Sequence, residues 1–326
     1  MGDPFGVGGE LSLMAWRDRE KCRIPPFVVL DSFARLQHVS EQTNLPAALQ
    51  PISTASDALD VFNTALPILD IEWNAQSALQ ATLTSITTAV DLTVTGQTKA
   101  IVTNPINKKN LYDVGFTFQG HTDFLEDLAY QKTGAPCKSI MMLASDQLRT
   151  VPITVHIPLE SVARALNENL ITDSIRIVSD ALVQDFGIGS PRIAVSGLNP
   201  HAGEKGALGT EDENIIAPAL ERLRKDGLQI AGPLPADTMF HARARKSYDV
   251  AVCMYHDQAL IPLKTLDFDR GVNVTLGLPF IRTSPDHGTA EDIAGTGTVN
   301  PDSFIEALKL ADQLADHRAA YTKKSS

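Results

Sequence analysis

Cysteine is scarce in this sequence. The 326 residues include only Cys22, Cys137 and Cys253, which lie far apart along the chain. An odd number of cysteines at these separations builds neither a disulfide framework nor a thiolate zinc site. Such usage is typical of a protein kept in a reducing compartment, so we expect a cytoplasmic location.

Long apolar runs and an excess of basic residues are also missing. No apolar stretch approaches the roughly 18 residues of a membrane helix, and the first residues do not resemble a signal peptide. Asp and Glu outnumber Lys and Arg by 39 to 28, which gives a net charge of -11. This balance argues against nucleic-acid binding. A chain this acidic that binds an anion would need a local pocket of His, Lys and Arg side chains.

The G-x-G-x-x-G fingerprint of a Rossmann nucleotide site is absent as well. Gly6, Gly8 and Gly9 lie near the start of the chain but do not have the required spacing. A glycine-rich loop of this kind usually follows a strand, and no strand precedes this one. We therefore expect the natural reading frame to begin upstream of Met1, and any dinucleotide to bind through a different loop.

What the sequence does contain is an alternation of short apolar runs and amphipathic segments. The apolar runs predict strands at residues 27–31, 99–103, 138–144, 150–156, 192–196, 249–255 and 272–276. Helical spacing predicts helices near residues 74–90, 159–168, 173–185, 211–225 and 301–319. Residues 40–70 are expected to be irregular. This alternation is typical of an α/β fold with a mainly parallel sheet, and the length allows two domains.

Three histidines share a setting at the ends of predicted strands, namely His156, His201 and His256. Ligands gather at the carboxyl ends of strands in open α/β sheets, and neutral imidazole is a common ligand of divalent metals. A single histidine in such a place more commonly only forms hydrogen bonds. Because the wide spacing matches no recognised local metal motif, a metal site and ordinary loop histidines both remain open on pattern alone.

A second group of residues could bind an anion such as a phosphate. His121 and Thr122 open a predicted helix, where backbone N–H groups and the helix dipole favour negative charge. We expect Thr122 or Asp123 to be the N-cap of that helix. Lys264 and Arg282 would add positive charge and Asn273 a side-chain donor. Solvated surface cations are the ordinary alternative.

The third feature is the polar stretch of residues 286–295, which ends in glycine and is followed by Asn300. On its own this stretch would be interpreted as a polar turn before the last helix. The three features together, however, resemble the 4-hydroxythreonine-4-phosphate dehydrogenase family of pyridoxal phosphate synthesis. The matching segments, in family order, are GDPFGVGGE, TNPINK, GHTDFLEDLA, VHIPL, GLNPHAGEKGALGTEDE, GPLPADTMF, YHDQALIPLK and GVNVTLGLPFIRTSPDHGTAEDIAG.

The resemblance implies the fold of isocitrate and isopropylmalate dehydrogenases, in which two α/β/α lobes flank a central cleft. Residues 1–123 with 288–326 would form the first lobe, and residues 124–287 the second lobe with the metal ligands. The resemblance also implies a homodimer whose active sites lie at the subunit interface. No nucleic acid or membrane partner is expected.

The resemblance assigns a role to each group of residues. One divalent ion, Zn, Mg, Mn or Co, would be bound by His156, His201 and His256, shared between two subunits. The substrate would be bound by His121, Thr122, Lys264, Asn273 and Arg282. By likeness to a loop of isopropylmalate dehydrogenases, NAD would contact His287, Gly288, Thr289, Asp292 and Asn300. Asp237 and Asp257 are candidates for proton transfer or for support of the metal ligands, and the sequence does not choose between them.

The expected reaction is the NAD-dependent, metal-assisted oxidation and decarboxylation of 4-phosphooxy-L-threonine to 3-amino-2-oxopropyl phosphate. A dehydrogenase of D-threonate or D-erythronate 4-phosphate from the same family would need nearly the same pocket. An acyl-phosphate transferase of related topology would need neither the three histidines nor the NAD loop. A non-catalytic binding protein would hold no metal and turn over nothing.

Overall fold

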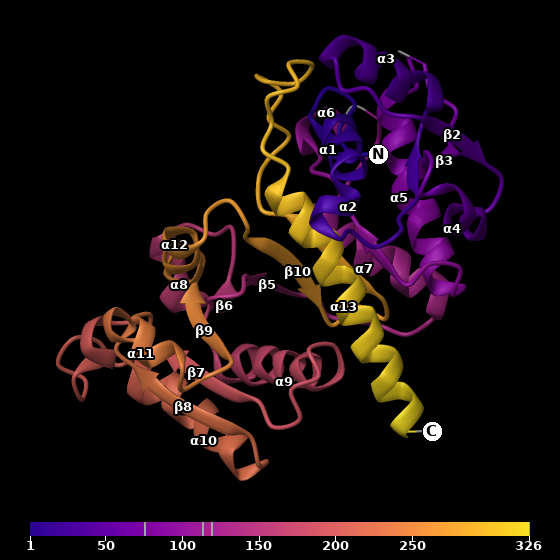
Figure 1. The fold of residues 1–326 in the computed structure, drawn as a ribbon. Coiled ribbons are helices and arrows are strands. Elements are labelled where there is room, and N and C mark those ends of the chain that lie inside the picture. The colour runs from indigo at the N-terminus through magenta and orange to yellow at the C-terminus, as the bar shows by residue number, and fades with distance from the viewer. Residues whose placement is uncertain (75, 113, 119, 326) are drawn as a thin grey trace. The chain divides into compact units, whose positions relative to one another are not determined.

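The computed structural model describes residues 1–74, 76–112, 114–118 and 120–325 (Figure 1). The chain divides into two compact units. Unit 1 contains Met1–Ser139 and Leu278–Ala315, and unit 2 contains Ile140–Gly277 and the end of the chain from Asp316. The lobe boundaries implied by the family resemblance stay a prediction. None of the described helices combines the length and the apolar character that a membrane crossing requires.

Unit 1 consists of helices around two small groups of strands. Its helices are α1 (Gly8–Arg17), α2 (Arg19–Cys22), α3 (Phe33–Thr43), α4 (Ala58–Val61), α5 (Ala78–Val94), α6 (Lys108–Tyr112), α7 (His121–Thr133) and the first part of α13 (Asp302–Ser325). Its strands are β1 (Val29–Asp31), β2 (Leu49–Ile52), β3 (Leu66–Asp70), β4 (Ala100–Val102) and β11 (Ile281–Pro285). β3 lies between β1 and β2 and is parallel to both, and β4 pairs in parallel with β11.

Residues 40–70 are not irregular, so that part of the prediction was wrong. They contain β2, α4 and β3, and Leu66 and Ile68 of β3 are fully buried. Pro51 and Pro67 lie inside the paired strands, and proline within a strand is usually a signal against a sheet because it cannot donate a ladder hydrogen bond. The burial of the apolar residues outweighs that loss here.

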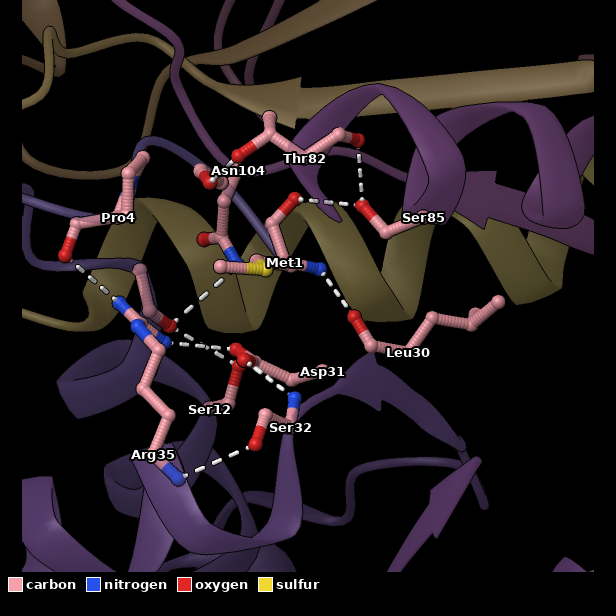
Figure 2. A network of polar contacts seen from close by, with 12 residues as sticks. Met1, Pro4, Ser12, Leu30, Asp31, Ser32, Arg35, Thr82, Ser85 and Asn104 are labelled. Atoms are coloured by element: carbon pink, nitrogen blue, oxygen red, sulfur yellow. Dashed lines mark hydrogen bonds and ion pairs between the residues drawn. The ribbon is translucent and has the colours of Figure 1, made fainter. Parts of the chain in front are cut away.

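A groove of about 440 Å³ lies in unit 1, lined by residues of both β1 and β4. Helix α5 contributes Ile86 and Ala89 to its walls, and α13 contributes Leu308. The amine of Met1 lies at this groove and donates a hydrogen bond of 2.6 Å to the carbonyl oxygen of Leu30 (Figure 2). Burial lowers the pKa of this amine below its ordinary value. The Met1 amine therefore takes part in the hydrogen bonds of unit 1.

A buried ion pair holds the same region together. The Arg35 guanidinium lies 2.8 Å from the Asp31 carboxylate, and both side chains are almost fully buried (Figure 2). Arg35 also donates to the carbonyl oxygen of Pro4, which ties the N-terminal loop to α3. Because a buried charge is costly unless it is paired, this network links β1, α3 and the loop before α1 in one arrangement.

Unit 2 is a six-stranded sheet with helices packed on it. Its strands are β5 (Ile140–Ala144), β6 (Arg149–Thr154), β7 (Arg192–Ser196), β8 (Gln229–Leu234), β9 (Val250–Tyr255) and β10 (Val272–Leu276). Its helices are α8 (Leu159–Ala165), α9 (Glu168–Gln184), α10 (Ala217–Lys225), α11 (Ala242–Arg245) and α12 (His256–Leu266). The strand order is β10-β5-β6-β9-β7-β8, with the pairs from β6 to β8 parallel and those of β5 antiparallel.

The centre of this sheet positions the candidate site. Val250, Ala251, Val252, Cys253 and Met254 of β9 are all fully buried, as expected for a strand covered on both faces. Because β6, β9 and β7 run parallel, their carboxyl ends meet at one edge of the sheet. The segments that carry the three candidate metal ligands follow these three strands.

Candidate active site

His156 and His256 lie side by side at the carboxyl edge of the unit 2 sheet. The centroids of their imidazole rings are 5.6 Å apart. The register of the parallel strands explains this, because Thr154 of β6 pairs with Tyr255 of β9 just before the two histidines. His156 has a φ of 49°, a left-handed conformation that is uncommon outside glycine, and His256 is the first residue of α12.

Asp257 contacts His256 directly. Its Oδ1 lies 2.7 Å from Nδ1 of His256. A hydrogen bond to one ring nitrogen fixes the tautomer and leaves the other nitrogen available, which is the usual support of a metal-bound histidine. Asp237, the other acidic candidate, is exposed in a short helix at Ala236–Thr238.

His201 lies in a loop with a strained backbone. His201, Ala202, Glu204 and Lys205 all have positive φ values, between 42° and 55°. Each such residue costs roughly 1–3 kcal/mol, so strain of this kind persists only where other contacts impose it, and it is common at functional sites. The His201 side chain is 66% exposed, with Nδ1 3.7 Å from a carboxylate oxygen of Glu204.

One copy of the chain does not complete a metal site among the described residues. No three His, Cys, Asp or Glu side chains in that part of the chain lie close enough to hold an ion. Two adjacent imidazoles with a carboxylate on one of them nevertheless fit part of the donor set of a divalent metal. The three-histidine site stays a prediction that needs a second copy of the chain.

The candidate anion site in unit 1 differs from a cluster of solvated cations. Arg282 lies on β11, is only 4% exposed and donates two hydrogen bonds to Oγ1 of Thr103, at 3.1 and 2.6 Å. Burial lowers the pKa of Arg282 to about 10, so the guanidinium remains protonated near neutral pH. The Thr103 hydroxyl supplies part of the polar environment that a buried charge requires.

His121 is the first residue of α7, and its environment makes it neutral. Burial holds the pKa of His121 well below its ordinary value of 6.5, and the positive charges of Arg282, the Met1 amine and Lys108 lower it further. Its Nε2 is buried and has no hydrogen-bond partner within the described structure. The N-cap of α7 is Gly120, so the prediction of Thr122 or Asp123 as the cap was wrong.

The remaining candidate substrate residues lie on other elements. Thr122 is in the first turn of α7. Asn273 lies on β10, and Lys264 lies on α12 with Nζ 5.7 Å from the centre of the Phe268 ring. Lys264 and Asn273 belong to unit 2, whereas His121 and Arg282 belong to unit 1. Their common contact with one substrate stays a prediction.

The candidate NAD loop is a set of turns between β11 and α13. Nδ1 of His287 lies 2.9 Å from the Gly288 carbonyl oxygen, and its Nε2 is buried without a hydrogen-bond partner in the described residues. The carbonyl oxygen of Thr289 accepts a hydrogen bond from the Val7 amide. Asp292 and Asn300 are exposed. Oδ1 of Asn300 accepts a hydrogen bond from the Asp302 amide at 2.9 Å, so the Asn300 side chain stabilises the start of α13.

Sequence reasoning missed Glu10, whose side chain binds the end of the candidate NAD loop. The Glu10 side chain is almost fully buried and accepts hydrogen bonds from the amides of Gly295, at 2.6 Å, and Gly297, at 2.8 Å. Both glycines have positive φ, 80° and 71°, which suits the tight turn. The signal that could have pointed to it is the position of Glu10 at the end of the glycine-rich segment GDPFGVGGE.

The chain matches a known protein family over most of its length. The family model for "Pyridoxal phosphate biosynthetic protein PdxA" matches residues 23–311. The chain belongs to this family. A PdxA-family relative from Methylorubrum populi, named 4-hydroxythreonine-4-phosphate dehydrogenase, is 48% identical over 98% of this chain and 94% of its own. A relative of the same name from Bradyrhizobium diazoefficiens is 49% identical over 97% and 95%.

Solved structures agree with the PdxA assignment. The 4-hydroxythreonine-4-phosphate dehydrogenase from Burkholderia phymatum superimposes with a TM-score of 0.82 at 36% identity, covering 96% of each chain. A terephthalate 1,2-cis-dihydrodiol dehydrogenase from Burkholderia xenovorans has a TM-score of 0.64 at 26% identity, again over 96% of each chain. The predicted family and the α/β fold class are confirmed.

Proposed function

We propose that this PdxA-family chain is an NAD-dependent 4-hydroxythreonine-4-phosphate dehydrogenase. It would oxidise 4-phosphooxy-L-threonine and form 3-amino-2-oxopropyl phosphate after decarboxylation, a step of pyridoxal phosphate biosynthesis. The observation that carries the proposal is the 48% identity, over 98% of the chain, to an enzyme of that name. Buried Arg282 and paired His156 and His256 add to it, since the reaction needs anion and metal binding.

The metal would be bound by His156 and His256 of one copy and by His201 of a second copy. When bound, a Zn, Mg, Mn or Co ion would polarise the substrate hydroxyl and stabilise the enolate left by decarboxylation. Asp257 would fix the His256 tautomer through its 2.7 Å contact with Nδ1. That role for Asp257 leaves Asp237 as the candidate for proton transfer.

Exposed apolar residues beside the histidine pair support a homodimer. Val155, Ile157 and Leu159 surround His156 along the chain, and their exposed fractions are 37%, 39% and 70%. Ile261 of α12 is 62% exposed. Large apolar side chains gathered near functional residues are typical of a surface that another chain covers. Such a contact would bring the partner's chain to the edge where the third ligand is needed.

Phosphate would be held by Arg282 as the charged group and by the Nε2 of His121 as a hydrogen-bonding group. The guanidinium is buried and fixed by Thr103, so little side-chain entropy is lost on binding. Thr122, Lys264 and Asn273 would complete the substrate contacts. NAD would contact His287, Gly288, Thr289, Asp292 and Asn300, where the buried Nε2 of His287 offers an unused polar atom.

The likeness to a dihydrodiol dehydrogenase supports one alternative substrate class. That protein shares the fold at 26% identity, and the substrate in its name is a diol without a phosphate group. The same fold can therefore accommodate oxidation of a substrate that is not a phosphate ester. D-threonate and D-erythronate 4-phosphate dehydrogenases stay open for a different reason, because their substrates would need nearly the same pocket. We place the reaction in the cytoplasm because Cys22, Cys137 and Cys253 are all free thiols.

A substrate panel tests the proposed function. The protein is incubated with NAD and, in separate arms, with Zn, Mg, Mn or Co or with a chelator, and NADH absorbance is followed. We expect the highest kcat/KM with 4-phosphooxy-L-threonine and loss of turnover in the chelator arm. A higher kcat/KM with D-threonate or D-erythronate 4-phosphate would mean that the proposed substrate is wrong. Turnover in the chelator arm would mean that the proposed metal requirement is wrong.

A further inference from the structure

The loop that carries His201 is held by one buried carboxylate. Asp212 is only 2% exposed. Its Oδ1 accepts a hydrogen bond of 2.8 Å from the Leu198 amide, and its Oδ2 accepts from the amide and the side-chain Nδ2 of Asn199, at 3.1 and 3.0 Å. Three donors of the segment before His201 therefore converge on this side chain, which lies beyond the loop in sequence.

The packing around this carboxylate leaves no room for adjustment. A Cβ on Gly197 would lie 2.5 Å from Oδ1 of Asp212 and 2.8 Å from the Cα of Ala202. A Cβ on Gly209 would lie 2.4 Å from Nδ2 of Asn199. Glycine at both positions lets the two ends of the loop close around Asp212, which itself begins a short π-helix at Asp212–Ile216.

Gln258 ties the same loop to the histidine pair. Its Nε2 donates to the Gly197 carbonyl oxygen at 2.9 Å, and its Oε1 accepts from the Met254 amide at 2.7 Å. Gln258 lies two residues after His256 in α12. The start of the His201 loop is thus joined to the element that presents His256, and Asp212 fixes the path of the chain from there.

We propose that Asp212 is a positioning residue for metal binding. It fixes Leu198 and Asn199, and with them the left-handed residues from His201 to Lys205, and thereby presents the His201 imidazole to the metal bound by a second copy. The inference rests on the proposed function, because it concerns the ligand set named there. An extended loop without these bonds would relax the positive φ values of His201 and Ala202 and turn the imidazole away.

The test measures metal affinity and stability separately. Cobalt is titrated into the apo dimer of wild type and Asp212→Asn, and the visible absorption of bound cobalt is followed. Asparagine would place a donor where two donors of Asn199 already point, so we expect affinity to fall by about tenfold or more. The matched control is Asp185→Asn, because Asp185 is a buried carboxylate of the same unit that binds Arg318 and not this loop. It should lower the melting temperature and leave cobalt affinity unchanged.

Two further variants separate the possible failures. Gly209→Ala keeps the Asp212 side chain but displaces Nδ2 of Asn199, one of the donors to it, so it should weaken cobalt binding even if Asp212→Asn does not fold. If His201→Ala weakens cobalt binding but Asp212→Asn and Gly209→Ala do not, the positioning role is wrong and the metal site stands. If wild type binds no cobalt, the proposed metal site fails and the inference fails with it.

Discussion

At the scale of single residues, His121 combines a half-buried side chain, whose Nε2 is buried, with three nearby positive charges. Because its pKa is lowered in the folded protein, the unfolded chain binds a proton below pH 6.5 that the folded chain does not. Stability contributed by the neutral ring is therefore complete above that pH and is lost as the pH falls, by at most about 1.4 kcal/mol per pH unit.

Replacing His121 by Gln should remove this dependence. We expect urea midpoints measured between roughly pH 5 and pH 7 to vary less for His121→Gln than for wild type. The control is His38→Gln, since His38 is exposed on α3. Equal pH dependence in all three proteins would mean that His121 is protonated in the folded state.

Asp292 carries the prediction on cofactor choice. An exposed carboxylate in the proposed NAD loop can accept hydrogen bonds from the adenosine ribose and would repel the 2′-phosphate of NADP. No Lys or Arg lies between His287 and Asn300 to offset this. We expect at least roughly a tenfold preference for NAD in kcat/KM, about 1.4 kcal/mol.

The decisive variant for that preference is Asp292→Lys. It should narrow or reverse the ratio of kcat/KM for the two cofactors. The matched control is Asp60→Lys on α4, which makes the same charge change at an exposed position outside the loop. A ratio that stays at the wild-type value in Asp292→Lys would remove this residue from the cofactor site.

At the scale of elements, α1 supports the loop between β11 and α13 through Glu10. Replacing its carboxylate by an amide turns one acceptor into a donor that faces the amides of Gly295 and Gly297. Glu10→Gln should therefore raise the KM for NAD by about tenfold while kcat changes little, because hydrogen bonds to a charged group are worth about 1.5–3 kcal/mol.

Asp31→Asn is the control for Glu10→Gln. It removes a buried carboxylate of the same unit that contacts Arg35 (Figure 2) and not the loop. It should lower stability and leave the KM for NAD unchanged. An equal rise in KM for both variants would mean that Glu10 acts only through the stability of unit 1.

Most of the strands that were predicted carry apolar runs, but such a run did not always suffice, because β3 with its buried Leu66 and Ile68 lies in the stretch that was expected to be irregular. β6, β7 and β9 could be predicted because Val, Ile and Ala fill them, and the histidine that follows β9 marks its end. Strand β11 was missed because Arg282, Thr283 and Ser284 are polar, yet all three are buried. Helix α5 was predicted near its observed bounds, although Ala75 at the predicted start lies outside the described residues.

The candidate site was predictable in its residue types and less so in its supports. The histidines at strand ends follow a local rule, so sequence alone could single them out. Glu10 and Asp212 could not be found in this way, because each supports a segment elsewhere in the chain. The N-cap of α7 was predicted wrongly because the helix begins earlier, at His121. Its N-cap is the extended Gly120, which provides no side-chain hydrogen bond that the sequence could reveal.

At the scale of the whole molecule, the pairing of His156 with His256 decides how a dimer would share its metal sites. Both rings belong to one chain and lie 5.6 Å apart. A hybrid of His201→Ala with His256→Ala would then keep one intact site, made from the unmodified pair of one chain and the unmodified His201 of the other.

Mixing experiments test this arrangement. After subunit exchange, His201→Ala with His256→Ala should recover roughly a quarter of wild-type activity, because half of the dimers are hybrids with one working site. His156→Ala mixed with His256→Ala should recover nothing, since each site of that hybrid lacks a ligand. Recovery by the second mixture would mean that these two histidines serve one metal from different chains.

The interior position of the Met1 amine matters for anyone who produces this protein. A residue fused to Met1 would alter this amine at the groove that β1 and β4 line, where it bonds Leu30. The other end of the chain is more permissive, because Tyr321, Thr322, Lys323 and Lys324 are exposed at the end of α13. An affinity tag is therefore better placed after the last helix than on the amine that bonds Leu30.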